Sequence, residues 1–123
     1  MQYDLQHIKN VALLGHTGSG KTTLAEAMLF ESGATTRRGS VEERNTVSDY
    51  TDIEHERGSS VFTTLMHLDW RGYKINLLDT PGYDDFCGEI ITALRVADTG
   101  LLILNAASGV EVGTELIWRY TEQ

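Results

Sequence analysis

The apolar residues of this chain gather in short runs, and the spacing inside each run predicts a strand or a helix. Residues 8–14, IKNVALL, form an apolar run that ends at Gly15, which is typical of a buried strand. Residues 21–32 place apolar side chains at helical spacing, and Gly33 follows as the expected helix end. A strand and a helix joined by a glycine-rich turn are therefore predicted first.

Residues 61–78 predict a hairpin. The first strand, residues 61–70, is rich in side chains that favour strands, and its apolar residues share one face: Phe62, Met66, Leu68 and Trp70. Arg71 and Gly72 make a tight turn, and residues 73–78, YKINLL, supply the second strand.

The remaining residues predict a helix, a strand and another helix. The first helix spans residues 84–97 and has an apolar inner stripe of Phe86, Ile90, Ala93, Leu94 and Ala97. The run LLILNAA, Leu101–Ala107, is typical of a central strand covered on both faces, and residues 114–120 begin a further helix. The order β-α-loop-β-β-α-β-α predicts one α/β domain over residues 1–123, with a doubly wound, mostly parallel sheet and one antiparallel hairpin.

Residues 34–60 show no hydrophobic period, and polar residues dominate them. A loop of this length in a compact domain is usually functional or disordered. Many of the chain's aspartate and glutamate residues lie in this segment, and we interpret the segment as a solvated loop.

Composition narrows the class of protein. The 123 residues are 41% hydrophobic and 23% charged, which fits an ordinary globular domain. The net charge of −8 argues against a broad nucleic-acid-binding surface. The single cysteine, Cys87, excludes an internal disulfide and fits a reducing compartment, and the longest apolar stretch is too short to span a bilayer. We expect a cytoplasmic protein that does not enter a membrane.

The segment 15-GHTGSGKT-22 fits the phosphate-binding pattern G-x-x-x-x-G-K-[ST], between a predicted strand and a predicted helix. Lys21 would reach the β- and γ-phosphates, Thr22 would ligate Mg²⁺, and Thr23 would touch the α-phosphate. The pattern predicts a P-loop NTPase whose nucleotide-binding residues are Gly15, His16, Thr17, Gly18, Ser19, Gly20, Lys21, Thr22 and Thr23. The alternative is a glycine-rich strand–helix turn that binds no ligand.

A second candidate site follows the hairpin, in 79-DTPGYDDF-86. Asp79 ends an apolar strand, so its carboxylate would lie beside the phosphate loop and hold Mg²⁺ through water. Gly82 would offer its backbone N–H to a γ-phosphate and make the following helix a movable switch. Taken alone, Asp79 is also compatible with a residue that merely starts a Thr-Pro-Gly turn.

Several motifs together carry a resemblance to a known family: GHTGSGKTT at 15–23, ERGSS at 56–60, DTPGYDDF at 79–86, LRVAD at 94–98 and AASGVEVGTE at 106–115. They resemble the GTP-binding domain of elongation factor G over essentially the whole chain. The resemblance implies GTP and GDP as ligands, Mg²⁺ as the metal and the ribosome as the partner, in translocation or recycling. It also implies that residues 34–60 are switch I, with Ser60 as a Mg²⁺ ligand, and that residues 79–86 are switch II.

Tyr83 departs from the family pattern and puts hydrolysis in question. Most elongation factor G proteins have a histidine there, which orients the attacking water. A phenol, with a pKa near ~10, is no base at neutral pH, but it can position water through a hydrogen bond. The resemblance implies a GTPase with Lys21 and Tyr83 as catalytic residues. The alternatives are a nucleotide-gated ribosome-binding module with little or no hydrolysis and a small ATP-dependent kinase, against which the hairpin argues.

Other departures refine the placement. Ser60 stands where the family has threonine, Ser59 where it has an apolar residue and Gly18 where many members have aspartate. The glycine-rich loop with Pro-Gly-Tyr resembles the divergent, second elongation factor G branch. No N-K-x-D guanine motif occurs up to Gln123, so we expect an N-terminal part of a GTP-binding domain, truncated before that motif. We also expect Leu101–Ala107 to form an exposed apolar edge through which the chain self-associates.

Overall fold

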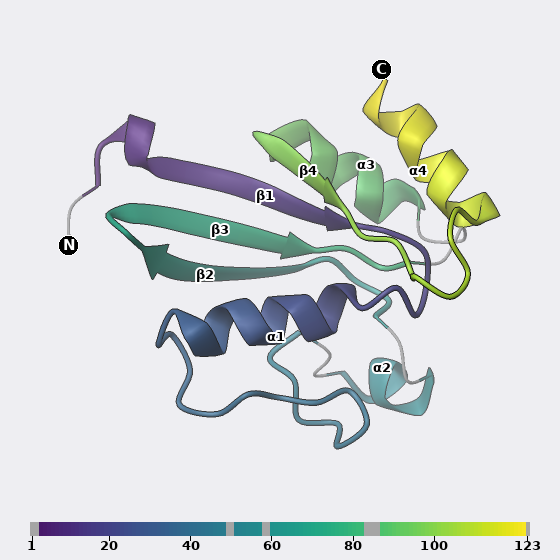
Figure 1. Cartoon of the computed structure of the whole chain (residues 1–123), viewed down its shortest axis with the longest axis horizontal. Helices are drawn as coiled ribbons and strands as arrows, with labels where there is room; N and C mark the ends of the chain where they lie inside the picture. Colours follow the sequence, from purple (N-terminus) through teal and green to yellow (C-terminus); the bar gives the residue numbers. More distant parts are fainter. Residues whose placement is uncertain (1–2, 49–50, 58–59, 83–86, 123) are drawn as a thin grey trace.

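The computed structural model describes residues 3–48, 51–57, 60–82 and 87–122. One four-stranded sheet has helices on both of its faces (Figure 1). The strands are β1 (Ile8–Leu14), β2 (Thr64–Trp70), β3 (Tyr73–Asp79) and β4 (Thr99–Leu102). The helices are the 3-10 turn η1 (Leu5–His7), α1 (Lys21–Glu31), α2 (Asp52–Arg57), α3 (Cys87–Val96) and α4 (Val112–Thr121).

The strands lie in the order β2-β3-β1-β4. β1 runs parallel to both of its neighbours, with Val11 opposite Leu77 of β3 and Leu13 opposite Leu101 of β4. β2 and β3 are antiparallel. The predicted α/β fold, with a mostly parallel sheet and one hairpin, is confirmed.

Successive residues of β1 point to opposite faces of the sheet, and each face has its own core. On the face that α3 and α4 cover, the buried cluster comprises Ala12, Leu14, Leu78, Ile90, Ala93 and Ile117. On the face that α1 covers, it comprises Leu13, Ala25, Leu29, Met66, Leu68 and Leu77. Because both faces are buried, β1 reads in the sequence as a continuous apolar run.

Helix α1 ends as the sequence predicts. Gly33 has a φ of 76°, and its N–H donates to the carbonyl of Phe30 at 3.0 Å. The N–H of Ala34 donates to the carbonyl of Leu29, also at 3.0 Å. This pair of bonds is the Schellman motif, which requires a left-handed residue where glycine stands.

The β2–β3 hairpin turns at Arg71 and Gly72, whose φ angles are 49° and 86°. Two positive φ angles define the type I′ turn that suits a two-residue hairpin. The predicted apolar face of β2 is only half right: Met66 and Leu68 are buried, but Trp70 is 46% exposed. Met66 and Leu68 belong to the cluster that α1 covers, whereas Trp70 does not, and the guanidinium of Arg71 lies over its ring, 5.7 Å from the ring centre.

The predicted start of the first hairpin strand also needs correction, whereas the predicted start of the following helix lies outside the described residues. β2 begins at Thr64 and not at residue 61, and Phe62 lies before the strand with 49% of its surface exposed. The helix predicted over residues 84–97 is α3, which begins at Cys87 in the part of the chain that the structure describes; Asp84 and Phe86 lie outside that part. Ile90 and Ala93 of the predicted stripe are buried.

The prediction of a central strand at Leu101–Ala107 is wrong in its bounds and its cover. β4 ends at Leu102, and within the described residues it pairs with β1 alone, at the edge of the sheet. Leu104 is 46% exposed. The chain bends because the Asn105 side chain accepts the N–H of Ala107 at 2.9 Å and its carbonyl accepts the N–H of Gly109 at 2.7 Å. The expected exposed edge is present, and self-association through it stays a prediction.

Helix α4 begins at Val112, two residues before the predicted start at Thr114. A capping box explains the earlier start, because Glu111 and Thr114 exchange side-chain and backbone hydrogen bonds across the first turn. Helix α2 lies within the segment that was predicted to be a loop. No helix among the described residues has the length and apolar character needed to cross a membrane.

Candidate nucleotide and magnesium site

Residues 15–20 connect β1 to α1 at the carboxyl end of the parallel strands. Gly15 has no room for a side chain, because a Cβ there would lie 2.5 Å from the carbonyl oxygen of Ile103. Gly20 is the N-cap of α1 with a φ of 97°, and it offers no side chain to cap the first turn. A helix N-terminus that follows such a loop favours an anion, because its first N–H groups have no partner within the helix.

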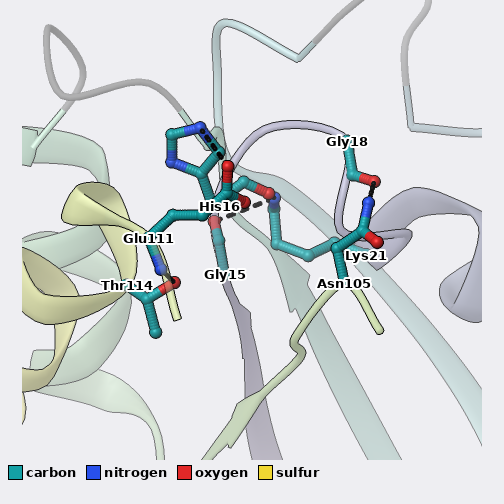
Figure 2. Close-up of polar contacts among 7 residues, drawn as sticks. All are labelled: Gly15, His16, Gly18, Lys21, Asn105, Glu111 and Thr114. Carbon is teal, nitrogen blue, oxygen red and sulfur yellow. Dashed lines mark hydrogen bonds and ion pairs between the residues drawn. The ribbon is translucent and has the colours of Figure 1, made fainter. Parts of the chain in front are cut away.

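Lys21 reaches back over the loop from the first turn of α1. Its ammonium donates to the carbonyl oxygens of Gly15 and His16, both at 3.0 Å, as Figure 2 shows. Gly82, which follows β3, lies against the same place: a Cβ there would be 2.8 Å from Lys21 Nζ and 2.6 Å from the backbone nitrogen of Thr17. The phosphate loop, Lys21 and Gly82 are therefore in close contact, as the sequence predicts.

Three oxygen-bearing side chains from distant parts of the chain meet beside the loop. Thr22 donates its hydroxyl proton to Asp79 Oδ2 at 2.7 Å, and its Oγ1 lies 3.4 Å from Ser60 Oγ. Asp79 is fully buried at the end of β3. Hydroxyl and carboxylate oxygens are hard ligands, which suit Mg²⁺ when phosphate oxygens complete its shell. The predicted metal ligands are thus brought together, and their chemistry fits the ion.

A cavity of about 300 Å³ opens over these groups. Its lining includes the predicted metal ligand Ser60 and several predicted nucleotide-binding residues: Thr17, Gly18, Gly20, Lys21, Thr22, Thr23 and Gly82. Thr17 lines this cavity, and its buried hydroxyl oxygen has no hydrogen-bond partner among the described residues; the Ser19 hydroxyl is also buried without such a partner, but Ser19 does not line the cavity. Buried polar atoms of this kind normally have a partner, so the loop fits a ligand rich in oxygen.

His16 contributes to the site through its backbone. Its carbonyl accepts from Lys21, whereas its imidazole is directed toward the start of α4 (Figure 2). There Nε2 lies 3.8 Å from Glu111 Oε1, and a Cβ on Gly113 would collide with Nδ1. Asn105 also donates from its side chain to the carbonyl of Gly18 at 3.4 Å. The segment between β4 and α4 therefore supports the phosphate loop.

Sequence reasoning missed several residues at this site. Val41 and Glu42 line the cavity, and the buried Ser48 donates its hydroxyl proton to Asp79 Oδ2 at 2.7 Å. All three come from residues 34–60, which carry no periodic pattern. The length of that loop and the resemblance that assigns it to switch I mark the segment as functional in the sequence, but neither identifies these three residues. Tyr83 and Ser59 lie outside the described residues, so the catalytic role of Tyr83 stays a prediction.

Known proteins are similar to this chain in sequence and in fold. The family model described as "Elongation factor Tu GTP binding domain" matches residues 6–123. Two curated relatives carry the name "Ribosome-releasing factor 2, mitochondrial". The protein of Danio rerio is 42% identical over 120 residues, which are 98% of this chain and 16% of the relative. That of Candida albicans is 44% identical over 111 residues, which are 90% of this chain and 14% of the relative.

Solved structures agree with the family model. A crystal structure of a protein from Thermus thermophilus has a TM-score of 0.91 and 50% identity, over 94% of this chain and 18% of that one. A bacterial selenocysteine-specific elongation factor, EF-Sec, has a TM-score of 0.71 and 22% identity, over 99% of this chain and 18% of that one, which shows the fold alone. This chain spans about one sixth of the length of these relatives. The match to residues 6–123 shows that the chain belongs to the family of elongation factor Tu GTP-binding domains.

Proposed function

We propose that this chain is the GTP-binding switch domain of an elongation factor G-like translational GTPase that acts on the ribosome, in translocation or recycling. The observation that carries the proposal is the convergence of Thr22, Ser60 and Asp79 beside the phosphate loop. The relatives are named ribosome-releasing factors, which supports the ribosome as the partner. The predicted placement in the second elongation factor G branch remains part of the proposal.

The loop and Lys21 would bind the phosphates of GTP or GDP. The backbone N–H groups of residues 15–20 would surround phosphate oxygens. The ammonium of Lys21, held at the loop by the carbonyls of Gly15 and His16, would neutralise charge on the β- and γ-phosphates. Thr23 lines the cavity one residue further along α1, where it would contact the α-phosphate.

Thr22, Ser60 and Asp79 would hold the metal. A hydroxyl can donate its proton and still offer a lone pair, so Thr22 can bond to Asp79 and ligate the ion at the same time. Ser60 would supply the second hydroxyl, whose oxygen lies 3.4 Å from that of Thr22. When bound, Mg²⁺ would neutralise charge that develops on the β- and γ-phosphate oxygens.

Gly82 and Tyr83 would couple the site to movement and hydrolysis. The backbone N–H of Gly82 would bond to the γ-phosphate and lose that partner after hydrolysis, which would release the segment leading to α3. Tyr83 would position the attacking water through its hydroxyl, because positioning and electrostatics outweigh proton abstraction in phosphoryl transfer.

Two measurements on the purified full-length protein test this proposal. A fluorescent GDP analogue should bind in a Mg²⁺-dependent manner and be displaced by GDP but not by ADP. Phosphate release from GTP should rise when ribosomes are added, both in the wild type and in Tyr83→His. Displacement by ADP would overturn guanine specificity. Ribosome-stimulated release seen only with Tyr83→His would leave a binding module in place of a GTPase.

Compartment and assembly complete the proposal. We assign the protein to the cytoplasm because the single cysteine suits a reducing compartment. The relatives are mitochondrial by name, so cell fractionation should separate the cytosol from the mitochondrial matrix. Sedimentation over a range of concentrations tests self-association through Leu101–Ala107, and a monomer throughout would contradict it.

A further inference from the structure

Glu26 is a buried acid in the middle of α1. Only 1% of its surface is exposed, although it lies on a helix whose other buried residues include Ala25 and Leu29. Its carboxylate accepts two backbone N–H groups, that of Gly39 on Oε2 at 3.0 Å and that of Val47 on Oε1 at 2.5 Å. A buried carboxylate is costly unless it is hydrogen-bonded, so these two bonds explain how the helix tolerates the charge.

The two donors bracket a compact segment, Gly39–Ser48, which we call the strap. Asn45 closes it: its side chain accepts the N–H of Ser40 at 2.7 Å, and its backbone N–H donates to the carbonyl of Ser40 at 3.4 Å. Gly39 fits against the carboxylate with no space to spare, because a Cβ there would lie 2.5 Å from Glu26 Oε2 and 2.9 Å from the carbonyl oxygen of Asn45. Glu26 therefore holds the strap against α1 through hydrogen bonds near both of its ends.

The strap forms part of the nucleotide site. Val41 and Glu42 line the cavity above the phosphate loop. At the end of the strap, the buried Ser48 donates to Asp79 Oδ2 at 2.7 Å, and its carbonyl accepts the hydroxyl of Thr64 at 3.0 Å. Groups that orient a metal-binding carboxylate influence metal affinity although they do not touch the metal. A displaced strap would move a cavity wall and remove a hydrogen bond from Asp79.

We propose that Glu26 is a positioning residue for the nucleotide site: its carboxylate fixes the strap, and the strap sets the cavity wall and the orientation of Asp79. This inference rests on the proposed function, because the site that Glu26 shapes is taken to be the site for guanine nucleotide and Mg²⁺. The hydrogen bonds that hold the strap join protein atoms alone, so the position of the strap can be tested separately from nucleotide binding.

The first test is Glu26→Gln in the full-length protein. The substitution keeps the shape of the side chain but replaces one accepting oxygen with an NH₂ group, which cannot accept a backbone N–H. The matched control is Glu31→Gln, which makes the same change of charge at an exposed position of the same helix. Trypsin can be used to test whether the strap has moved, because it cleaves after arginine. Three exposed arginines lie in the strap or just before it: Arg37, Arg38 and Arg44.

The rate of limited trypsin digestion measures how firmly the strap is held. The rate at which a fluorescent GDP analogue is released measures the state of the nucleotide site. In Glu26→Gln we expect cleavage at the three arginines about 10-fold faster than in the wild type. We also expect the Mg²⁺ concentration that half-maximally slows GDP release to rise about 10-fold. Glu31→Gln should match the wild type in both. A general loss of stability would speed cleavage throughout the domain and would not shift the Mg²⁺ requirement selectively.

A second variant keeps the proposal testable if Glu26→Gln does not fold. Gly39→Ala leaves α1 intact and places a methyl group against Glu26 Oε2, so it should push the strap away and reproduce both effects. Wild-type cleavage rates in both variants would overturn the anchoring role, and faster cleavage with an unchanged Mg²⁺ requirement would overturn the link to the site. A wild type that binds no GDP would contradict the proposed function, while the digestion would still decide the anchoring role.

Discussion

The two faces of the sheet are stabilised by different kinds of contact. On the face that α3 and α4 cover, the core cluster is apolar and includes Leu14, Ile90 and Ile117. The buried polar residue Thr114 lies in the first turn of α4, where it takes part in the capping box, and not in that cluster. On the face that α1 covers, an apolar core is joined by buried polar groups, Glu26, Ser48 and Asp79, each in a short hydrogen bond. Apolar burial is non-directional and supports the fold, whereas hydrogen bonds fix where individual atoms lie. The face that must place atoms around a ligand is the one that uses directional bonds.

The strongest test of this contrast is a cavity on the apolar face. Ile117→Ala removes a buried side chain of α4 and should destabilise the domain by about 3 kcal/mol. Hydrogen exchange of the β1 amides in the full-length protein would measure that loss, because it reports the opening of one region within a longer chain. Affinity for GDP below the unfolding temperature should stay within about two-fold of the wild type. A selective loss of Mg²⁺-dependent affinity would contradict the division between the faces.

A polar substitution on the other face should have the opposite profile. Asp79→Asn retains the shape of the side chain but removes the charge that would face Mg²⁺ and weakens its bonds from Thr22 and Ser48. We expect Mg²⁺-dependent affinity for GDP to fall on the order of 100-fold. Fluorescence titration at high and low Mg²⁺ measures the change. The affinity without Mg²⁺ serves as the internal control, and an equal fall there would show damage to the loop itself.

Gly82→Ala should have a smaller effect at the same site. The added methyl group would meet the backbone nitrogen of Thr17 and the ammonium of Lys21, so the segment after β3 must move away from the loop. We expect GTP to bind about 10-fold more weakly while GDP is nearly unaffected, since only GTP carries the γ-phosphate that Gly82 would contact. Competition between the two nucleotides tests this, and an equal loss for both would assign Gly82 a purely structural role.

The smallest effect is expected near the N-terminus, away from both cores. The side-chain hydrogen bond between His7 Nδ1 and the carboxylate, with a smaller contribution from the backbone N–H of His7, holds the pKa of Asp4 below its usual value. The stability that this pair contributes is therefore present above the unfolded pKa of about 3.9 and is lost as the pH falls through the lower folded value. Asp4→Asn should narrow the difference in melting temperature between pH 6 and pH 3 only slightly, because the group is exposed. A drop of several degrees at pH 6 would show that η1 matters more to the fold.

Local patterns predicted the parts of this fold that local physics determines. β1 has the predicted bounds, and the Arg71–Gly72 turn and Gly33 lie where their backbone angles require. The end of β4 was mispredicted because an apolar run does not reveal a turn that a side chain stabilises, as Asn105 does. Trp70 was mispredicted because the reach of α1 over the sheet is a tertiary property.

The candidate site also contains some residues that local patterns predict and others that they do not. The phosphate loop and Asp79 follow from motifs, because their chemistry requires fixed residue types at fixed spacing. Val41, Ser48 and Glu26 could not be predicted in this way. The hydrogen bonds that place Glu26 and Ser48 join side chains to groups 13 to 31 positions away in the sequence, and such bonds leave no periodic trace.

The hairpin turn at Arg71–Gly72 is a suitable position for attaching a fluorescent label. It lies at the start of β3, and Asp79 at the other end is on the order of 20 Å away at ~3.3 Å per residue. Cys87 is the only cysteine of these 123 residues, so Cys87→Ser combined with Arg71→Cys would leave one thiol in this domain for a dye. A fluorophore there would report tumbling and ribosome encounter without touching the nucleotide. Adding Glu43→Cys would give a second thiol on the strap, and energy transfer between the two dyes would then measure movement of the strap near the phosphates.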